Sequence, residues 1–108
     1  MNTLLIVDDE KSVRYSFERL FDSYYNVITA EDGPAALNIL DTGTGNIDVV
    51  FLDVRMPGMD GIEVLKKIRG RNKNIPVIMM TAFSDSKTAI EAMREGAFDY
   101  LLKPLRNE

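Results

Sequence analysis

Polar residues suited to phosphate or metal chemistry follow four short apolar segments of the chain. They are Asp8 and Asp9, Asp53, Thr81 and Lys103. The apolar segments that precede them are 4–7, 49–52, 77–80 and 100–102. A carboxylate at the end of a buried strand is costly unless it meets a cation or several hydrogen-bond donors. If the four segments are parallel strands, their ends lie along one edge of a sheet, where such folds place their binding sites.

This grouping predicts Mg²⁺-dependent transfer of a phosphoryl group to Asp53. Aspartate can serve as the nucleophile that forms an aspartyl phosphate. Mg²⁺ prefers oxygen ligands and keeps several waters, so oxygens from Asp8, Asp9 and Asp53 are sufficient for a site. The other phosphoryl oxygens need compensating charge or hydrogen-bond donors, which Lys103 and the hydroxyl of Thr81 can supply.

Each of these residues has an ordinary structural explanation when it is taken alone. An acidic pair after a strand often caps the next helix, and a lysine near a strand end is usually solvated. The segment 53–58, with its proline and glycine, is by itself typical of a turn. The occurrence of all these residues after successive apolar segments favours a phosphoacceptor site over a set of unrelated surface positions.

The elements expected to position these residues alternate between strand and helix. Asp32 is the predicted N-cap of a helix with an early proline, and Gly96 is the predicted C-terminal end of another. Short apolar strands that alternate with helices of about ten residues predict an α/β fold with a parallel sheet and helices on both faces. Strands are expected at 4–7, 26–30, 48–52, 77–81 and 99–102, and helices at about 12–21, 33–40, 62–70 and 86–96.

The composition predicts a single domain, residues 1–108, and narrows the chemistry. The chain is 45% hydrophobic and 28% charged, which is enough apolar content for one core. Its net charge of −4 argues against direct nucleic-acid binding. It has no cysteine and no histidine, which excludes thiolate and imidazole metal sites within it. Neither a membrane span nor a signal peptide is recognised, so a cytoplasmic location is expected.

With these motifs the chain resembles the receiver domain of two-component response regulators. The resemblance covers essentially the whole chain and rests on the segments LIVDDE (5–10), FLDVRMPGMDG (51–61), MTA (80–82) and DYLLKP (99–104). The stretch from 80 to 104 is most similar to receivers that precede sigma-54-dependent AAA+ activators. The resemblance implies a flavodoxin-like, doubly wound sheet of five parallel strands in the order 2-1-3-4-5.

The resemblance also implies a role for each residue of the site. Asp53 is the expected phosphoacceptor, with a sensor histidine kinase as the donor and an output domain or partner as the target. The expected metal ligands are Asp9 and Asp53 directly, the backbone carbonyl of Arg55, and Asp8 mainly through water. Thr81, Lys103 and the amide of Ala82 are expected to contact the phosphoryl oxygens. Tyr100 is the expected rotating switch residue, and the Lys103–Pro104 bond is expected to be cis.

One departure from the family pattern concerns the end of the chain. Family members carry a fifth helix after the Lys-Pro pair, whereas only residues 105–108 follow it here. That difference suggests a truncated chain or a split gene product. A missing or truncated fifth helix would leave apolar surface on one sheet face, with Ile78, Met80 and Leu101 or Leu102 as candidates. We therefore expect the chain either to self-associate through that face, as a homodimer, or to be markedly less stable than a longer version that carries the helix.

Three other functions fit parts of the pattern. A hydrolase that forms an aspartyl phosphate, as in the haloacid dehalogenase superfamily, would need a second acid at position 55, where this chain has Arg55. A flavin- or nucleotide-binding module would need a glycine-rich phosphate loop, and none is present. A pseudo-receiver used only for dimerisation would usually have lost a site residue. We therefore expect a signalling switch that is not an enzyme, beyond assisting its own phosphorylation and dephosphorylation.

Overall fold

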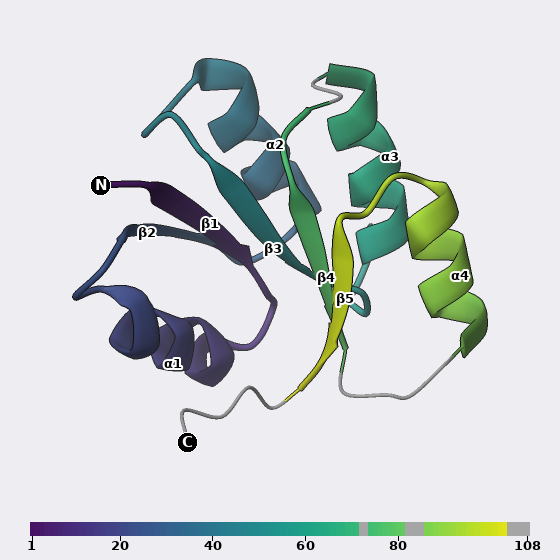
Figure 1. The fold of residues 1–108 in the computed structure, drawn as a ribbon, viewed down its shortest axis with the longest axis horizontal. Coiled ribbons are helices and arrows are strands. Elements are labelled where there is room, and N and C mark those ends of the chain that lie inside the picture. The colour runs from purple at the N-terminus through teal and green to yellow at the C-terminus, as the bar shows by residue number, and fades with distance from the viewer. Residues whose placement is uncertain (72–73, 82–85, 104–108) are drawn as a thin grey trace.

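The computed structural model describes residues 1–71, 74–81 and 86–103, which form a parallel sheet flanked by helices (Figure 1). The sheet order is β2-β1-β3-β4-β5, and each neighbouring pair of strands is parallel. The predicted flavodoxin-like fold is therefore confirmed. The strands are β1 (Thr3–Val7), β2 (Asn26–Ala30), β3 (Val49–Asp53), β4 (Val77–Thr81) and β5 (Asp99–Leu102). The helices are α1 (Lys11–Phe21), α2 (Gly33–Thr42), α3 (Gly61–Arg71) and α4 (Ser86–Arg94).

The core is divided between the two faces of the sheet, because successive strand residues point to opposite sides. The larger cluster packs alternate residues of the strands, such as Leu52 and Met79, against α2, α3 and α4. The smaller cluster contains the intervening residues, such as Phe51 and Met80, together with Phe17 of α1. The helices therefore lie on both faces, as right-handed crossovers require.

The helix ends follow the predicted signals in part. The Asp32 carboxylate accepts a hydrogen bond from the Ala35 amide at 2.9 Å, which confirms the predicted cap. Helix α2 continues to Thr42, beyond the predicted end, and stops where Gly43 adopts a left-handed φ of 72°. The predicted stop of α3 at 70 is also wrong. Glycine only weakens a helix, so α3 continues through Gly70 to Arg71, whose side-chain Nη1 donates to the Lys67 carbonyl at 3.1 Å.

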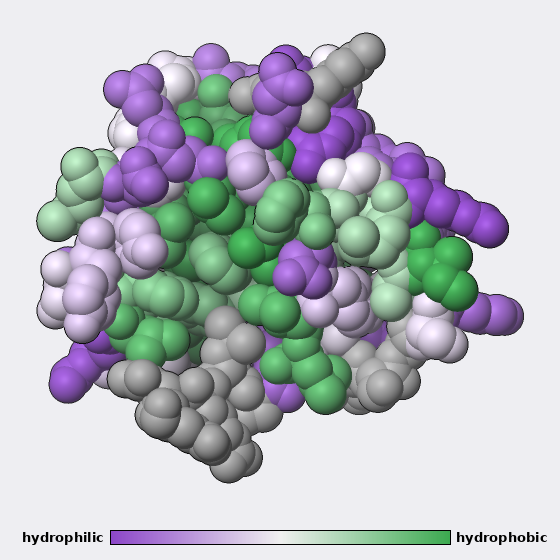
Figure 2. Space-filling model, in the orientation of Figure 1, coloured by the Kyte–Doolittle hydropathy of each residue, from purple (hydrophilic) through white to green (hydrophobic). Residues whose placement is uncertain are grey.

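The sheet face that carries α1 is less completely covered than the other. On this face, Ile78 and Leu101 are half-buried. Leu102, the other candidate, is 54% exposed but lies on the opposite face, because it follows Leu101 in β5 and pairs with Thr81. Met80 was expected to be uncovered but is fully buried, because it packs in the cluster that contains Phe17. In Figure 2, hydrophobic side chains gather in the middle of the face toward the viewer, over the strands. The expectation about a fifth helix falls on residues 104–108, outside the described part of the chain.

None of the helices in the described ranges has both the length and the hydropathy needed to cross a membrane.

Candidate functional site

The parallel register brings the predicted site residues to one edge of the sheet. Val7 pairs with Leu52, so the residues that follow them, Asp8 and Asp53, lie side by side. Asp53 in turn pairs with Met80, the residue before Thr81. Thr81 pairs with Leu102, and Lys103 follows directly. The prediction that these residues lie close together is therefore correct, because all these strands end at the same edge of the sheet.

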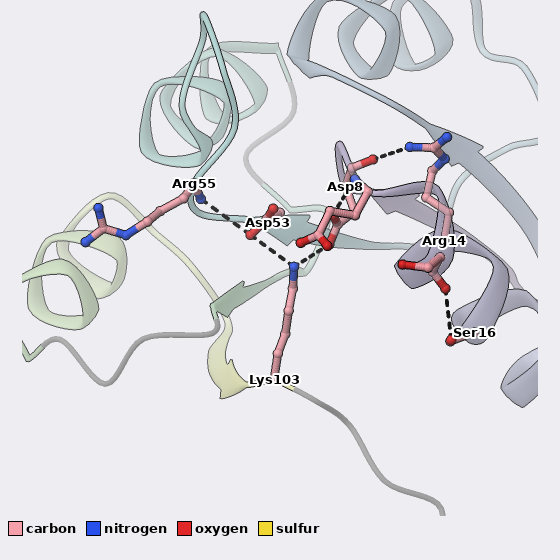
Figure 3. Close-up of polar contacts among 8 residues, drawn as sticks. Asp8, Arg14, Ser16, Asp53, Arg55 and Lys103 are labelled. Carbon is pink, nitrogen blue, oxygen red and sulfur yellow. Dashed lines mark hydrogen bonds and ion pairs between the residues drawn. The ribbon is translucent and has the colours of Figure 1, made fainter.

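Three carboxylates and one ammonium form the centre of the site (Figure 3). Carboxylate oxygens of Asp8, Asp9 and Asp53 all lie within 4.8 Å of one another. Asp8 and Asp53 are buried, whereas Asp9 is exposed, so the cluster opens to solvent on the Asp9 side. The Lys103 Nζ lies 2.5 Å from Asp8 Oδ2 and 3.4 Å from Asp53 Oδ1. One positive charge thus faces three negative charges.

The pKa values of Asp53 and Lys103 are both raised in this site. Burial raises the pKa of Asp53 to about 6, and the neighbouring charge of Asp8 adds to the increase. Lys103 and the Arg55 amide act in the opposite direction but do not outweigh these two causes. Burial by itself would lower the pKa of Lys103, yet the hydrogen bond to Asp8 and the charges of both aspartates raise it. The ionised site therefore favours the arrival of a further cation.

The loop after β3 is shaped by a close contact with the start of α3. The Gly61 amide donates to the Val54 carbonyl at 2.7 Å, and a Cβ at Gly61 would collide with the carbonyl oxygen of Asp53. Glycine is therefore required here by space. The Arg55 amide is 3.4 Å from Asp53 Oδ1, a long contact, while its side chain points away from Asp53 toward α4 (Figure 3). That the Arg55 carbonyl is a metal ligand stays a prediction.

The predicted phosphoryl and switch contacts are placed to different degrees. Thr81 is buried at the end of β4, and its carbonyl accepts a hydrogen bond from the Lys103 amide at 2.6 Å. Tyr100 on β5 is half-buried, packs against the larger core cluster and has a buried hydroxyl. Its rotation stays a prediction. The predictions about the Ala82 amide and about a cis bond before Pro104 concern residues outside the described part of the chain.

Sequence reasoning missed the contacts that hold Asp8. Its Oδ1 accepts a hydrogen bond from the Glu10 amide at 3.0 Å, and its backbone carbonyl accepts one from Arg14 Nη1 at 2.7 Å. The tight pairing of Lys103 with Asp8 was also not foreseen, since we expected the lysine to serve the phosphoryl group at Asp53. The sequence carried one signal for Arg14, an arginine in the first turns of the helix that follows the acidic pair.

The donor set fits a hard divalent cation. It consists of carboxylate oxygens, it has an excess of negative charge, and one member is open to solvent. Mg²⁺ binds such sites through one or two carboxylates while it keeps several waters. Histidine and cysteine are absent from the whole chain, so softer metals have no preferred ligand here.

Comparison with known proteins agrees with this geometry. Residues 4–108 match the family model "Response regulator receiver domain". The chain is 48% identical over 100 residues to the DNA-binding transcriptional regulator NtrC of Klebsiella pneumoniae, covering 92% of this chain and 21% of that protein. It therefore spans about a fifth of the length of that relative. NtrC, AtoC and ZraR, three of the similar relatives, are response regulators of the sigma-54 activator type, which confirms the subfamily suggested by the motifs.

Solved structures show the same fold. Chemotaxis protein CheY4 of Vibrio cholerae superposes with a TM-score of 0.91 at 35% identity, covering 98% of this chain and 89% of that one. Response regulator TrrA of Thermotoga maritima, solved in complex with Mg²⁺ and beryllofluoride, superposes with a TM-score of 0.86 at 34% identity, covering 98% and 90%. The chain belongs to the response regulator receiver domain family, the phosphorylation-dependent switches of two-component systems.

Proposed function

We propose that residues 1–108 form one receiver domain in which Asp53 accepts a phosphoryl group from a sensor histidine kinase. The observation that carries this proposal is the position of Asp53, which is buried at the strand edge, shares Lys103 with a second buried carboxylate, Asp8, and lies 3.4 Å from the lysine Nζ. A buried aspartate with a raised pKa and an excess of nearby negative charge is poorly stabilised as it stands. A raised pKa caused by burial and by a nearby like charge is typical of functional sites.

In the proposed reaction, one carboxylate oxygen of Asp53 attacks the phosphorus of a phosphohistidine. The oxygen–phosphorus bond forms as the nitrogen–phosphorus bond breaks, and the electron pair leaves with the imidazole of the donor. Lys103 provides a positive charge for the phosphoryl oxygens, and the Thr81 hydroxyl is a candidate hydrogen-bond donor to them. The acceptor must be ionised to attack, and a cation bound beside Asp53 would favour the ionised form.

Mg²⁺ is the proposed cofactor, held by Asp9 and Asp53 directly, by Asp8 mainly through water, and by the Arg55 carbonyl. When bound, it supplies positive charge that offsets the phosphoryl oxygens and the carboxylates. The clustering of the three acids within 4.8 Å supports this assignment. Asp8 is already occupied by Lys103 and the Glu10 amide, which supports an indirect role for it.

The proposed consequence is a change in conformation rather than turnover of a substrate. Phosphorylation adds roughly −1.5 to −2 charge at Asp53. Thr81 and Lys103, joined through their backbones, are placed to pass this change to β5 and Tyr100. In Lys103→Ala, phosphorylation should persist in part, while the NMR shifts of Thr81 and Tyr100 on adding beryllofluoride should be lost. Shifts like those of the unmodified protein would remove Lys103 from the switch.

The proposed target is an output domain or partner that controls transcription, in keeping with the sigma-54 activators that the chain resembles. The negative net charge supports an indirect role, in which this chain does not itself bind nucleic acid. We place it in the cytoplasm, where a kinase and a transcriptional output would meet it.

Phosphorylation by acetyl phosphate tests the proposed function directly. The unmodified chain should show a shift in Phos-tag electrophoresis that needs Mg²⁺ and disappears completely in Asp53→Asn. Asp22→Asn, which changes an exposed aspartate at the end of α1, should leave the shift unchanged. A shift that persists in Asp53→Asn would move the acceptor to another residue, with Asp8 the first to examine.

The incompletely covered sheet face supports a further proposal, a homodimer. Ile78 and Leu101 are half-buried on this face. A second copy that covered them would remove apolar surface from water. Sedimentation velocity should then show a concentration-dependent dimer that Ile78→Glu weakens, whereas Ile90→Glu on α4 should not affect it. A monomer at all concentrations would contradict the proposal.

A further inference from the structure

Asp9 depends on its backbone for its position in the acidic cluster. It is exposed, and within the described residues no hydrogen bond or ion pair fixes its side chain. By contrast, each polar group of its neighbour Asp8 is engaged. The Asp8 amide donates to the Ala30 carbonyl at 3.1 Å, its two carboxylate oxygens contact Glu10 and Lys103, and its carbonyl accepts from Arg14.

The Arg14 bond acts on the peptide unit that joins the two aspartates. The carbonyl of Asp8 and the amide of Asp9 belong to one planar group, so a hydrogen bond that fixes the carbonyl also fixes the plane from which Asp9 begins. The distance of 2.7 Å from Arg14 Nη1 is short for this kind of bond and is typical of a charged donor. Figure 3 shows the guanidinium beside Asp8, on the side away from Lys103.

The choice of partner by Arg14 is informative. The guanidinium lies beside Asp8, a member of the acidic cluster, yet in the part of the chain that the structure describes it forms no ion pair and binds a neutral carbonyl instead. Arg14 therefore leaves the carboxylate oxygens free for a cation. It is also held firmly, because it is half-buried one turn before Phe17, which packs in the core 5.7 Å from the ring of Phe51.

From these contacts we infer that Arg14 is a positioning residue for the metal site, because it orients the Asp8–Asp9 peptide so that the Asp9 carboxylate faces Asp53. This inference rests on the proposed function, since it concerns the cation that the reaction needs. It connects the end of β1 to the first turns of α1, whose N-cap Glu10 has no side-chain cap of its own.

The sign of the effect separates positioning from simple electrostatics. Removing a positive charge beside three carboxylates should by itself strengthen Mg²⁺ binding, because one repulsion is lost. If Arg14 acts by positioning, Arg14→Met should instead weaken Mg²⁺ binding, by about tenfold as for other groups that orient metal ligands. Arg14→Lys, which can still donate to the carbonyl, should restore part of the affinity.

Arg19→Met provides the matched control, since it removes the same charge from the same helix. Arg19 is exposed and contacts Tyr15, with Nη1 3.0 Å from the hydroxyl. Calorimetric titration with Mg²⁺ alone should give weaker binding for Arg14→Met and unchanged or slightly tighter binding for Arg19→Met. The amide resonance of Asp9 in the metal-free protein should move in the first variant and stay in place in the second.

Phosphorylation kinetics then distinguish the failure of this inference from the failure of the proposed function. With acetyl phosphate, Arg14→Met should need more Mg²⁺ for half-maximal rate but should reach the same rate at saturation. Equal Mg²⁺ affinity in the unmodified protein and in both arginine variants would overturn the role of Arg14, even if Asp53 is phosphorylated. Should Arg14→Met fail to fold, affinity in Arg14→Lys equal to that of the unmodified protein, with an unmoved Asp9 resonance, would overturn it as well.

Discussion

A partly buried cationic side chain lies at each end of the sheet, but the two side chains have partners of different kinds. At the carboxyl end, Lys103 Nζ meets two carboxylates, Asp8 and Asp53. At the amino end, Arg69 of α3 meets neutral backbone carbonyls. Its Nη1 donates to Ile75 at 2.7 Å, and its Nε and Nη2 donate to Gly96 at 3.0 and 2.7 Å. These bonds connect α3 to the segments that lead into β4 and β5.

The difference shows in which cluster the charge is compensated by hydrogen bonds and in which cluster an excess of charge remains. Burial lowers the pKa of Arg69, but a guanidinium stays charged in proteins, and its three hydrogen bonds compensate it. Gly96 has a φ of 98°, and a Cβ there would come within 2.8 Å of Arg69 Nε, so the backbone is shaped around this contact. At the other end, excess negative charge remains. We therefore assign structural work to the Arg69 cluster and chemistry to the Asp8–Asp53–Lys103 cluster.

The largest effect on stability is expected from Lys103→Ala, because it leaves buried carboxylates without their cation. Breaking a buried pair from one side typically costs about 3–5 kcal/mol of unfolding free energy. Urea unfolding in EDTA should show this loss, and Mg²⁺ should recover part of it by replacing the missing charge. Lys66→Ala, an exposed lysine of α3, should change the unfolding free energy little. Equal effects of the two substitutions would contradict the assignment.

Asp53 should make the free energy of unfolding depend on pH, by on the order of 3 kcal/mol. Its pKa is about 6 in the folded protein, against an ordinary value of 3.8. Between these values the folded state binds more protons than the unfolded state, so the free energy of unfolding falls as pH rises. Protonated Asp53 therefore contributes its full stabilisation to the folded protein below pH 3.8, and this stabilisation is lost above about pH 6.

The measurement compares the metal-free protein with Asp53→Asn, which cannot titrate at this position. Above pH 7 the variant should be the more stable of the two, and its advantage should shrink as pH falls through 6 toward 4. Ionisable groups distant from Asp53 cancel in this difference. If the difference in the free energy of unfolding between the two proteins does not vary with pH, the pKa of Asp53 is not raised by folding.

A smaller loss, about 2 kcal/mol, is expected from Arg69→Met, because it leaves the Ile75 and Gly96 carbonyls without their donor. Arg71→Met is the control on the same helix. Arg71 pairs with Asp41 at 2.6 Å, but both side chains are more than 40% exposed, so its loss should cost less than about 1 kcal/mol. Neither substitution should alter Mg²⁺ affinity. A change in that affinity would show that the two ends of the sheet are coupled.

Much of the fold could be predicted because its signals are local. Alternating apolar segments and helix caps, such as Asp32, are read from neighbouring residues, and the structure confirms the strands and the cap. The order of the strands was implied by the family resemblance, and the structure confirms it as well. Helix ends were less predictable, since Gly70 neither stops α3 nor contacts anything that would require glycine. The burial of Met80 could not be foreseen either, because it depends on how α1 packs across the sheet.

For the site, the sequence by itself determined which residues gather. Acids after β1 and β3 and a lysine after β5 must meet once the strands run parallel, because parallel strands end at a common edge. Only the tertiary structure decided how they share their charges. Lys103 lies closer to Asp8 than to Asp53, Arg14 holds a carbonyl in place of a carboxylate, and burial raises the pKa of Asp53. Distances and desolvation set these preferences, and both arise only when separate elements pack together.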